Sequence, residues 1–199
     1  MKRKRGRRIL NKSRVEAFTD AIVAIVMTIM VLEIKVPHGA GWDRLWAEKA
    51  YFVAYLISFF RIATTWYNHH YLFTNAHWIS RRAFWLNIAW LFFMSLFPVA
   101  TGWISEEPHS RIAAYFYFLI FAVWGITFYV MVAVLAHDNP KYSKRILQML
   151  RPKRSLFELA SLIIGIGVIY WLPIMALIIL GINIIFWLVF PPKGSDRLL

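Results

Sequence analysis

The chain has 199 residues, of which 60% are hydrophobic and 18% aromatic, while only 17% are charged. Soluble proteins carry about 25% charged residues, and a run of roughly 20 apolar residues is long enough to cross a bilayer core. The composition therefore excludes an ordinary soluble domain and indicates an all-α, polytopic membrane protein. Cysteine is absent, which excludes disulfides, thiol catalysis and cysteine-ligated metal.

The formal net charge of +13 is also typical of proteins that bind nucleic acids. Here the basic residues lie mainly in the tails and in the loops between apolar runs. Membrane topology and attraction to anionic lipid headgroups account for such a distribution. We therefore expect membrane lipids as partners, and no nucleic acid.

In chain order, a basic tail at residues 1–13 precedes six apolar runs. The tail is similar to the charged region of a signal peptide, but the run behind it is too long and lacks a small-residue cleavage site, so we expect it to be retained. Pro98 is expected to kink the third run. The loops leave no room for another domain, so the sequence predicts one six-helix domain over residues 1–199. The approximate spans are 15–36, 45–73, 83–104, 111–136, 156–170 and 172–190.

The basic residues predict the orientation of these spans. An even number of spans places both termini on one side of the membrane, and 18 of the 23 Lys and Arg residues then share that side. Cytoplasmic loops carry the excess of Lys and Arg in membrane proteins. The sequence therefore predicts a multi-pass protein of the cell membrane with both termini in the cytoplasm.

Ionisable residues gather where the first apolar run begins. Arg14, Glu16 and Asp20 lie at its inner end, and Thr28 is a single hydroxyl deep inside it. A charged side chain at the centre of a membrane helix costs about 2.5–3.5 kcal/mol on insertion scales, so such groups need partners or water. The residues alone leave two interpretations open. They form either an interfacial anchor, in which Arg14 reaches the headgroups and Asp20 compensates the helix dipole, or part of an ion pathway.

A second polar set lies near the end of the second span, at the predicted depth of Arg14 and Asp20. Polar groups in lipid must be satisfied inside the protein, so a hydrogen-bonded network between spans 1 and 2 is expected. A metal site that combines these histidines with Asp20 is an alternative. Adjacent histidines point about 100° apart on a helix, however, and rarely bind one ion. The set comprises Trp66, Asn68, His69, His70 and, just beyond the span, His77.

The motif Arg14-x-x-x-Phe18-Thr19-Asp20 resembles the R-x-x-x-F-[S/T]-D motif on the first helix of the prokaryotic relatives of transmembrane protein 175, the endosomal and lysosomal potassium channel. The resemblance extends over the whole chain in its length, six spans, basic N-terminal tail and W-x-N-H cluster late in span 2. Thr19 stands where serine is commoner, a change that keeps the hydroxyl. The resemblance implies a homotetrameric potassium-selective channel with no enzyme activity, no cofactor and no small-molecule substrate.

The resemblance also implies roles for individual residues. Four copies of the first helix would surround a pore on the oligomer axis, with Ile25 and Leu32 as its apolar constriction and Thr28 as the hydroxyl implicated in selectivity, near which potassium passes. The motif residues would support this helix by contacting Trp66, Asn68 and the histidines rather than by touching ions. The supporting motif residues are Arg14, Phe18, Thr19 and Asp20.

Helical geometry agrees with this assignment, because Ile25, Thr28 and Leu32 share one face of a helix. Such a face would make a hydrophobic constriction, able to gate by dewetting, beside one ring of hydroxyls. The residues alone favour a plainer interpretation, a stripe facing lipid or the bundle in which Thr28 bonds its own backbone. A single six-helix chain has no obvious central lumen, so a pore requires a closed assembly of copies. The sequence also lacks a T-V-G-Y-G filter, and modest selectivity is therefore expected.

Two other functions are compatible with the polar residues. A proton-coupled secondary transporter would use Asp20 with His69 or His70 as a relay. A membrane enzyme acting on lipid would use the same three side chains as catalysts. The chain shows no internal repeat, which disfavours the transporter, and no paired nucleophile, which disfavours the enzyme.

Overall fold

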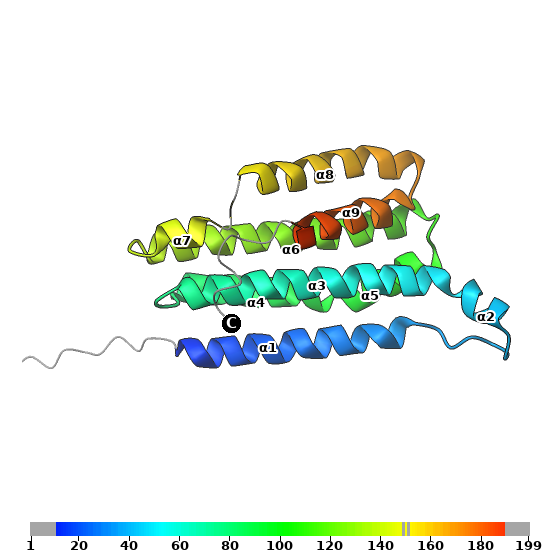
Figure 1. Cartoon of the computed structure of the whole chain (residues 1–199), viewed down its shortest axis with the longest axis horizontal. Helices are drawn as coiled ribbons and strands as arrows, with labels where there is room; N and C mark the ends of the chain where they lie inside the picture. The colour runs from blue at the N-terminus through cyan, green and yellow to red at the C-terminus, as the bar shows by residue number, and fades with distance from the viewer. Residues whose placement is uncertain (1–10, 149, 151, 190–199) are drawn as a thin grey trace, which may run out of the picture.

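The computed structural model describes residues 11–148, 150 and 152–189. The predicted basic tail therefore lies outside the described residues except for its last three. Figure 1 shows that the long helices run side by side along one axis, with α1 at one edge of the bundle and α8 at the opposite edge. The elements are α1 (Lys12–Ile29), the 3₁₀ turn η1 (Met30–Glu33), α2 (Trp42–Ala47), α3 (Lys49–Asn75), α4 (Arg81–Ser95), α5 (Phe97–Glu106), α6 (Arg111–Asp138), α7 (Ser143–Leu147), α8 (Pro152–Trp171) and α9 (Met175–Val189).

Three of the predicted spans correspond to helical stretches that are long and apolar enough to cross a membrane. These stretches are Lys12–Glu33, Arg81–Glu106 and Arg111–Asp138. Shorter apolar helices cover Ser155–Trp171 and Met175–Trp187. The predicted all-helical membrane fold is thus confirmed for the described residues, and α3 supplies the remaining long helix with a more polar sequence.

Several boundaries differ from the predicted spans. The first span, expected over 15–36, begins at Lys12 and ends at Glu33, with its last turn in the 3₁₀ form of η1. The second span was expected from residue 45, but residues 42–47 form the separate helix α2, and α3 begins only at Lys49. The third span divides at Leu96 into α4 and α5, with Pro98 in the first turn of α5. Proline lacks a backbone N–H and is tolerated in a first turn, so the expected kink takes the form of a helix break.

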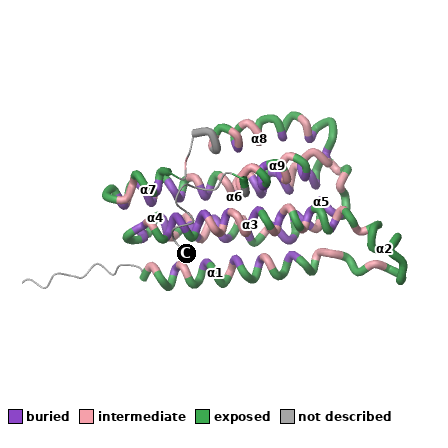
Figure 2. The backbone as a smooth tube through the Cα atoms, viewed as in Figure 1, coloured by how far each residue is buried: buried purple, intermediate pink, exposed green. Residues whose placement is uncertain are grey.

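The helices pack in layers between the two edges. α1 contacts α3, α4 and α5, whereas α8 contacts α6 and α9. Between these layers α4 and α6 pack closely through large aromatic side chains. Trp90 of α4 stacks on Trp124 of α6 with ring centroids 5.3 Å apart, and Phe97 of α5 meets Trp124 edge-on at 5.0 Å. Figure 2 shows that buried residues concentrate in the middle helices, while α1 and α8 each keep a long exposed side.

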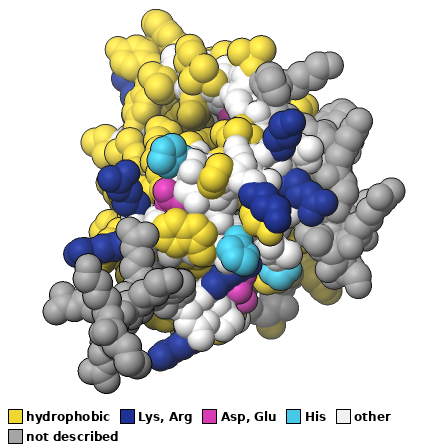
Figure 3. Space-filling view, turned by 90° about the vertical axis from the view of Figure 1, so that its left-hand side faces the viewer, with side chains coloured by type: hydrophobic (Ala, Val, Ile, Leu, Met, Phe, Trp, Pro, Cys, Tyr) yellow, Lys and Arg dark blue, Asp and Glu magenta, His cyan; other side chains and the backbone are white. Residues whose placement is uncertain are grey.

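Basic side chains gather at one end of the helices. This end holds the start of α1, the start of α4 and the short helix α7, and Figure 3 views the molecule from it. Lys and Arg residues predominate over acidic ones on this face. The segments that the sequence predicts to be on one side of the membrane therefore lie together. The described basic residues at this end are Lys12, Arg14, Arg81, Arg82, Lys141, Lys144 and Arg145.

A buried ion pair joins α3 to the layer of α8 and α9. Arg61 donates a 2.9 Å hydrogen bond to the Glu158 carboxylate and a 2.8 Å hydrogen bond to the Asn183 side chain. Trp187 and Tyr129 also donate to Glu158. Because both charges are removed from water, each depends on the other for its stability in the protein.

We predict that Glu158→Gln destabilises the fold by about 3–5 kcal/mol, because it leaves the buried charge of Arg61 uncompensated. The matched control is Glu106→Gln, which removes the exposed ion pair with Lys35, 2.8 Å long. Exposed pairs contribute about 0–1 kcal/mol, so the control should unfold almost as the parent chain does. Thermal and chemical unfolding in detergent micelles measures the stability of both variants. Equal losses of stability would contradict the importance of the buried ion pair.

Candidate functional site

The first helix has one face in the bundle and one face outside it. Its packed face carries Val23 and Val26, which are 3% and 5% exposed. The opposite face carries Ile25, which is 55% exposed, and Leu32 of η1, which is 77% exposed. Thr28 lies between them and is also exposed. The three predicted pore residues thus share a surface of the subunit that no helix of the same chain covers among the described residues.

The hydroxyl of Thr28 bonds its own helix, as the plainer interpretation anticipates. Its Oγ1 donates to the backbone carbonyls of Ala24 and Ile25, at 3.0 and 2.9 Å. Donation uses the proton and leaves the oxygen lone pairs free to accept. The bond to the backbone therefore orients the oxygen and does not remove it as a ligand for a cation.

The packed face of α1 is fixed by a chain of three polar side chains. Thr19 donates from Oγ1 to the Val15 carbonyl at 2.9 Å, so its oxygen must accept the next bond. Asn87 of α4 supplies that bond from Nδ2 at 2.8 Å, which turns its Oδ1 toward His69 of α3. His69 Nε2 lies 2.8 Å from this oxygen and must therefore carry the proton that it donates. One amide thus links α1, α4 and α3.

Aromatic rings enclose the histidine end of this chain. The His69 imidazole stacks between Phe73, at 4.1 Å between centroids, and Trp90, at 4.8 Å. Thr19 is fully buried, Asn87 is fully buried and His69 is 2% exposed. A polar group so deeply buried requires its hydrogen bonds, because each unmet one costs free energy. The network therefore specifies how α1 sits on the bundle.

Asp20 makes a second link between α1 and α3. Its carboxylate accepts a 2.8 Å hydrogen bond from the indole Nε1 of Trp66. The Trp66 ring also lies against His70, with centroids 6.1 Å apart. Asp20 therefore contacts α3 directly, whereas Thr19 is linked to α3 through Asn87.

Other residues of the predicted network lie elsewhere. Asn68 is on a different face of α3 and donates to the Thr64 carbonyl at 2.8 Å, and His77 stacks on Tyr142 beyond the end of α3. Arg14 and Phe18 are exposed on α1, and Phe18 shares the face of Ile25. Within the motif, Thr19 is thus the buried residue, whereas Asp20 is exposed but bonded to Trp66 of α3.

Asn87 links the two predicted polar sets and belongs to neither of them. It lies on α4, in the third predicted span. Its signal was present in the sequence, because it is the single amide in the apolar run from Ala83 to Met94. Such an amide must find partners inside the protein.

The histidines do not assemble a metal site in the described part of the chain. No three His, Cys, Asp or Glu side chains lie together there. His69 uses its Nε2 on Asn87, and His77 lies with Tyr142 rather than with Asp20. The alternative of a site shared by these histidines and Asp20 therefore finds no geometric support.

Comparison with known proteins assigns this arrangement to a family. Residues 14–98 match the family described as endosomal/lysosomal potassium channel TMEM175. A potassium channel of Chryseobacterium sp. (strain P1-3) is 33% identical over 171 residues, covering 84% of this chain and 88% of that protein. The chain belongs to the TMEM175 family. The matched segment contains the complete motif together with Trp66, His69 and Asn87.

Two further TMEM175 relatives extend the comparison. The crystal structure of a lysosomal potassium-selective channel TMEM175 homolog from Chamaesiphon minutus superposes with a TM-score of 0.74 at 25% identity, covering 89% of this chain and 96% of that one. The Gallus gallus protein named endosomal/lysosomal proton channel TMEM175 is 35% identical over 120 residues, covering 53% of this chain and 24% of that protein. All three relatives are named as channels and none as an enzyme.

We predict that Asn87→Leu destabilises the protein by about 1–3 kcal/mol, because it leaves the buried His69 Nε2–H without an acceptor. The control is Asn75→Leu, whose amide donates only to the Tyr71 carbonyl of its own helix at 2.8 Å. Thermal unfolding of the purified variants measures the difference. A loss as large in the control as in Asn87→Leu would contradict the proposed importance of the bridge.

Proposed function

We propose that the protein is a potassium channel whose pore lies on the axis of a homotetramer and is lined by α1. The observation that carries the proposal is the division of α1 into two faces. One face is held by a buried hydrogen bond to Asn87 of α4 and an exposed one to Trp66 of α3, and the other face presents the pore residues outside the subunit. A helix anchored on one side and apolar on the other is suited to line an axis shared by several copies.

Closed cyclic assembly explains why these apolar side chains are left uncovered. In the described structure α1 stands at the edge of the bundle (Figure 1). Four copies that meet along α1 would bury its flanks against neighbours and leave one stripe facing the axis. The names of the bacterial relatives as potassium channels support potassium as the permeant ion.

The exposed stripe supports specific roles for its members. Ile25 lies in α1 and Leu32 in the 3₁₀ turn η1, so at rises of about 1.5 and 2.0 Å per residue they are separated by roughly 12 Å, and each would form its own apolar ring. Narrow apolar rings resist hydration and can close a pore without a steric plug. The ring of Thr28 oxygens between them would be the polar site that a dehydrating potassium ion meets, with the ion passing transiently and no resident metal or cofactor involved.

The remaining features fit one six-span domain per subunit over residues 1–199, embedded in the cell membrane among its lipids. The basic end of the helices in Figure 3 would face the cytoplasm under the positive-inside rule, with both termini on that side. On this proposal Arg14, which is exposed beside the start of α1, reaches the headgroup region.

Proton conduction is a second candidate, because the Gallus gallus relative is named a proton channel. The proton-coupled relay considered from the sequence needs Asp20 and a span 2 histidine in contact. In the structure Asp20 bonds Trp66, and His69 is enclosed by rings and bonded to Asn87. Potassium flux along the exposed stripe is therefore favoured. Liposome assays that vary the potassium, sodium and proton gradients separately distinguish the two.

We predict that Ile25→Asn increases potassium flux through reconstituted liposomes, because an amide ring wets and widens the apolar constriction. The control is Ile163→Asn, the same substitution at a residue of α8 that is 63% exposed but lies at the other edge of the bundle. Flux that is unchanged in Ile25→Asn, or raised equally by the control, would sink the assignment of α1 as pore helix.

We also predict that Thr28→Ala reduces the ratio of potassium to sodium permeability, while Thr28→Ser retains it. Serine preserves an oxygen that can bond the same helix carbonyls and still accept, whereas alanine removes it. Reversal potentials under paired potassium and sodium gradients measure the ratio. An alanine variant as selective as the parent would show that the Thr28 ring does not choose the ion.

Assembly is tested independently by the mass of the detergent-solubilised complex. A tetramer is expected. A monomer that conducts potassium would overturn the shared axis even if the flux predictions held.

A further inference from the structure

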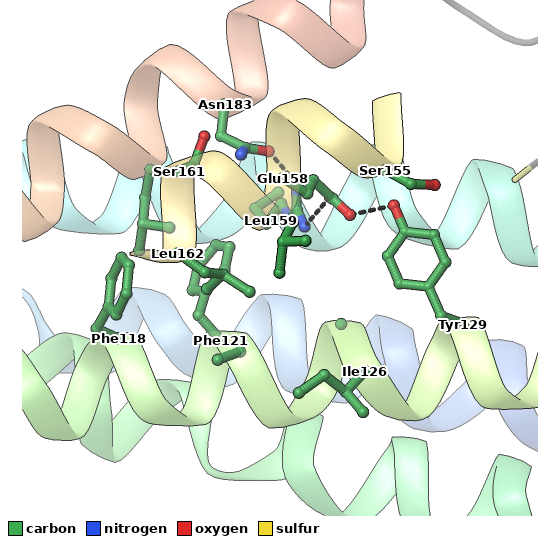
Figure 4. Close-up of a pocket in the computed structure, with 14 residues that line it drawn as sticks. Phe118, Phe121, Ile126, Tyr129, Ser155, Glu158, Leu159, Ser161, Leu162 and Asn183 are labelled. Carbon is green, nitrogen blue, oxygen red and sulfur yellow. Dashed lines mark hydrogen bonds and ion pairs between the residues drawn. The ribbon is translucent and has the colours of Figure 1, made fainter. Parts of the chain in front are cut away.

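A cavity of about 230 Å³ lies between α6 and α8, at the edge of the bundle away from α1. Its walls come mainly from apolar side chains of these two helices, among them Phe118, Ile126, Leu159 and Leu162. Figure 4 shows Phe118 and Tyr129 of α6 pointing toward α8 from the two ends of the space, with Glu158 between them and bonded to Tyr129. The cavity thus runs along the helices, with one polar end and one apolar end.

The divergence of two helices creates this space. Toward the C-terminal end of α8, a Cβ placed on Gly165 would collide with the ring of Phe118. The close approach of α6 and α8 at this point therefore requires glycine. Further along α6, a Cβ placed on Gly125 would meet no atom within 4 Å. The helices are therefore in contact at one end and separated beside Gly125, which lines the cavity.

The polar end of the cavity carries little net charge. The charges of Arg61 and Glu158 compensate each other across 2.9 Å, and Asn183, Trp187 and Tyr129 add further hydrogen bonds to the pair. The buried Nε of Arg61 is left without a hydrogen-bond partner among the described residues, and a neutral acceptor could meet it. A second ion placed here would compete with a pair that is already matched. The site therefore suits a neutral group next to its polar end and a hydrocarbon along its walls.

The mouth of the cavity continues the apolar surface of the bundle edge. Ile126 is 54% exposed and Leu159 is 55% exposed, and the neighbouring Ile163 of α8 is 63% exposed. In a membrane-spanning bundle, such a surface faces either lipid or another subunit. The proposed tetramer axis is at α1, on the far side of the bundle, so lipid is the neighbour here (Figure 1).

We infer that the cavity binds one acyl chain of a bilayer phospholipid. The polar end lies where α6 approaches its last turns and α8 begins, so the chain would enter from the leaflet on the basic side of the protein. Pockets for drug-sized ligands hold about 300–1,000 Å³, and a cavity of about 150 Å³ already takes benzene. A volume between these values matches a segment of hydrocarbon chain rather than a whole lipid or a drug-sized molecule.

The matched variants for a test are two helix glycines. Gly125→Leu places an isobutyl group in the cavity, whereas Gly167→Leu places the same group on α8, where an added Cβ also meets nothing within 4 Å but which does not line the cavity. Leu162→Phe fills the cavity from the α8 side and serves as a second blocking variant. Each variant is first compared with the parent by thermal unfolding, and blocking is read from a variant that retains the parent's unfolding temperature.

The experiment uses the full chain in liposomes that contain phosphatidylcholine with a diazirine midway along one acyl chain. After irradiation, mass spectrometry of peptides measures labelling at the buried cavity wall, Phe118 and Leu180, which are both 3% exposed, relative to the exposed Ile163. We expect the wall to be labelled in preference to Ile163, with a several-fold loss of this preference in Gly125→Leu or Leu162→Phe and none in Gly167→Leu.

Three results would overturn the inference. Labelling spread evenly over the wall and Ile163 would mean ordinary contact with surrounding lipid. Wall labelling unaffected by the blocking variants would mean that the chain does not enter the cavity. Labelling by a free fatty acid bearing the same diazirine, with none from the phospholipid, would mean a soluble amphiphile as occupant. None of these readouts depends on ion flux, so the pore proposal stands or fails separately.

Discussion

The structure depends on the requirement that polar side chains buried among apolar helices find their partners within the protein. Asn87 meets this requirement for two other helices at once, since its amide donates to Thr19 and accepts from His69. A displacement of α1 would break the first bond, and a displacement of α3 would break the second. Apolar packing alone, which is nondirectional, would allow α1 to slide or rotate on the bundle. One bridging amide removes that freedom.

The α3 helix connects this anchoring to the rest of the subunit. On the side toward α1 and α4 it presents Trp66 and His69, and on another side it presents Arg61, whose partners are on α8 and α9. Both sides carry polar groups that would lack hydrogen-bond partners if they faced lipid. This double demand explains why α3 carries polar side chains on the sides that pack against other helices. Its remaining side is apolar and lies at the surface, where Val53, Leu56 and Phe60 are exposed.

Sequence patterns predicted most of the fold, and they did so where a local rule applies. Long apolar runs and basic loops marked the helices, and Pro98 marked the break, because a missing N–H acts at its own position. The link of the motif to the second span also followed from depth and polarity. The Asn87 bridge could not be predicted in this way, because the partners of Asn87 depend on which face of α4 packs against α1. Likewise the partner of Arg61 is 97 residues away in Glu158, and no spacing rule pairs them. The boundary between α2 and α3 has no local signal, because Ala47, Glu48 and Lys49 all favour helix and no Gly or Pro marks the break.

Substitutions on the uncovered stripe of α1 and on its packed face have different consequences for the subunit. The stripe packs little against its own subunit, because the side chains of its residues are exposed. These residues are Ile25, Thr28 and Leu32. Replacing them therefore leaves the subunit nearly as stable as before. In an assembly of identical chains, however, each replacement is repeated in every copy around the same axis. In the proposed pore, a single substitution would therefore alter a whole ring of side chains, while the hydrogen-bonded face that builds the subunit stays as it is.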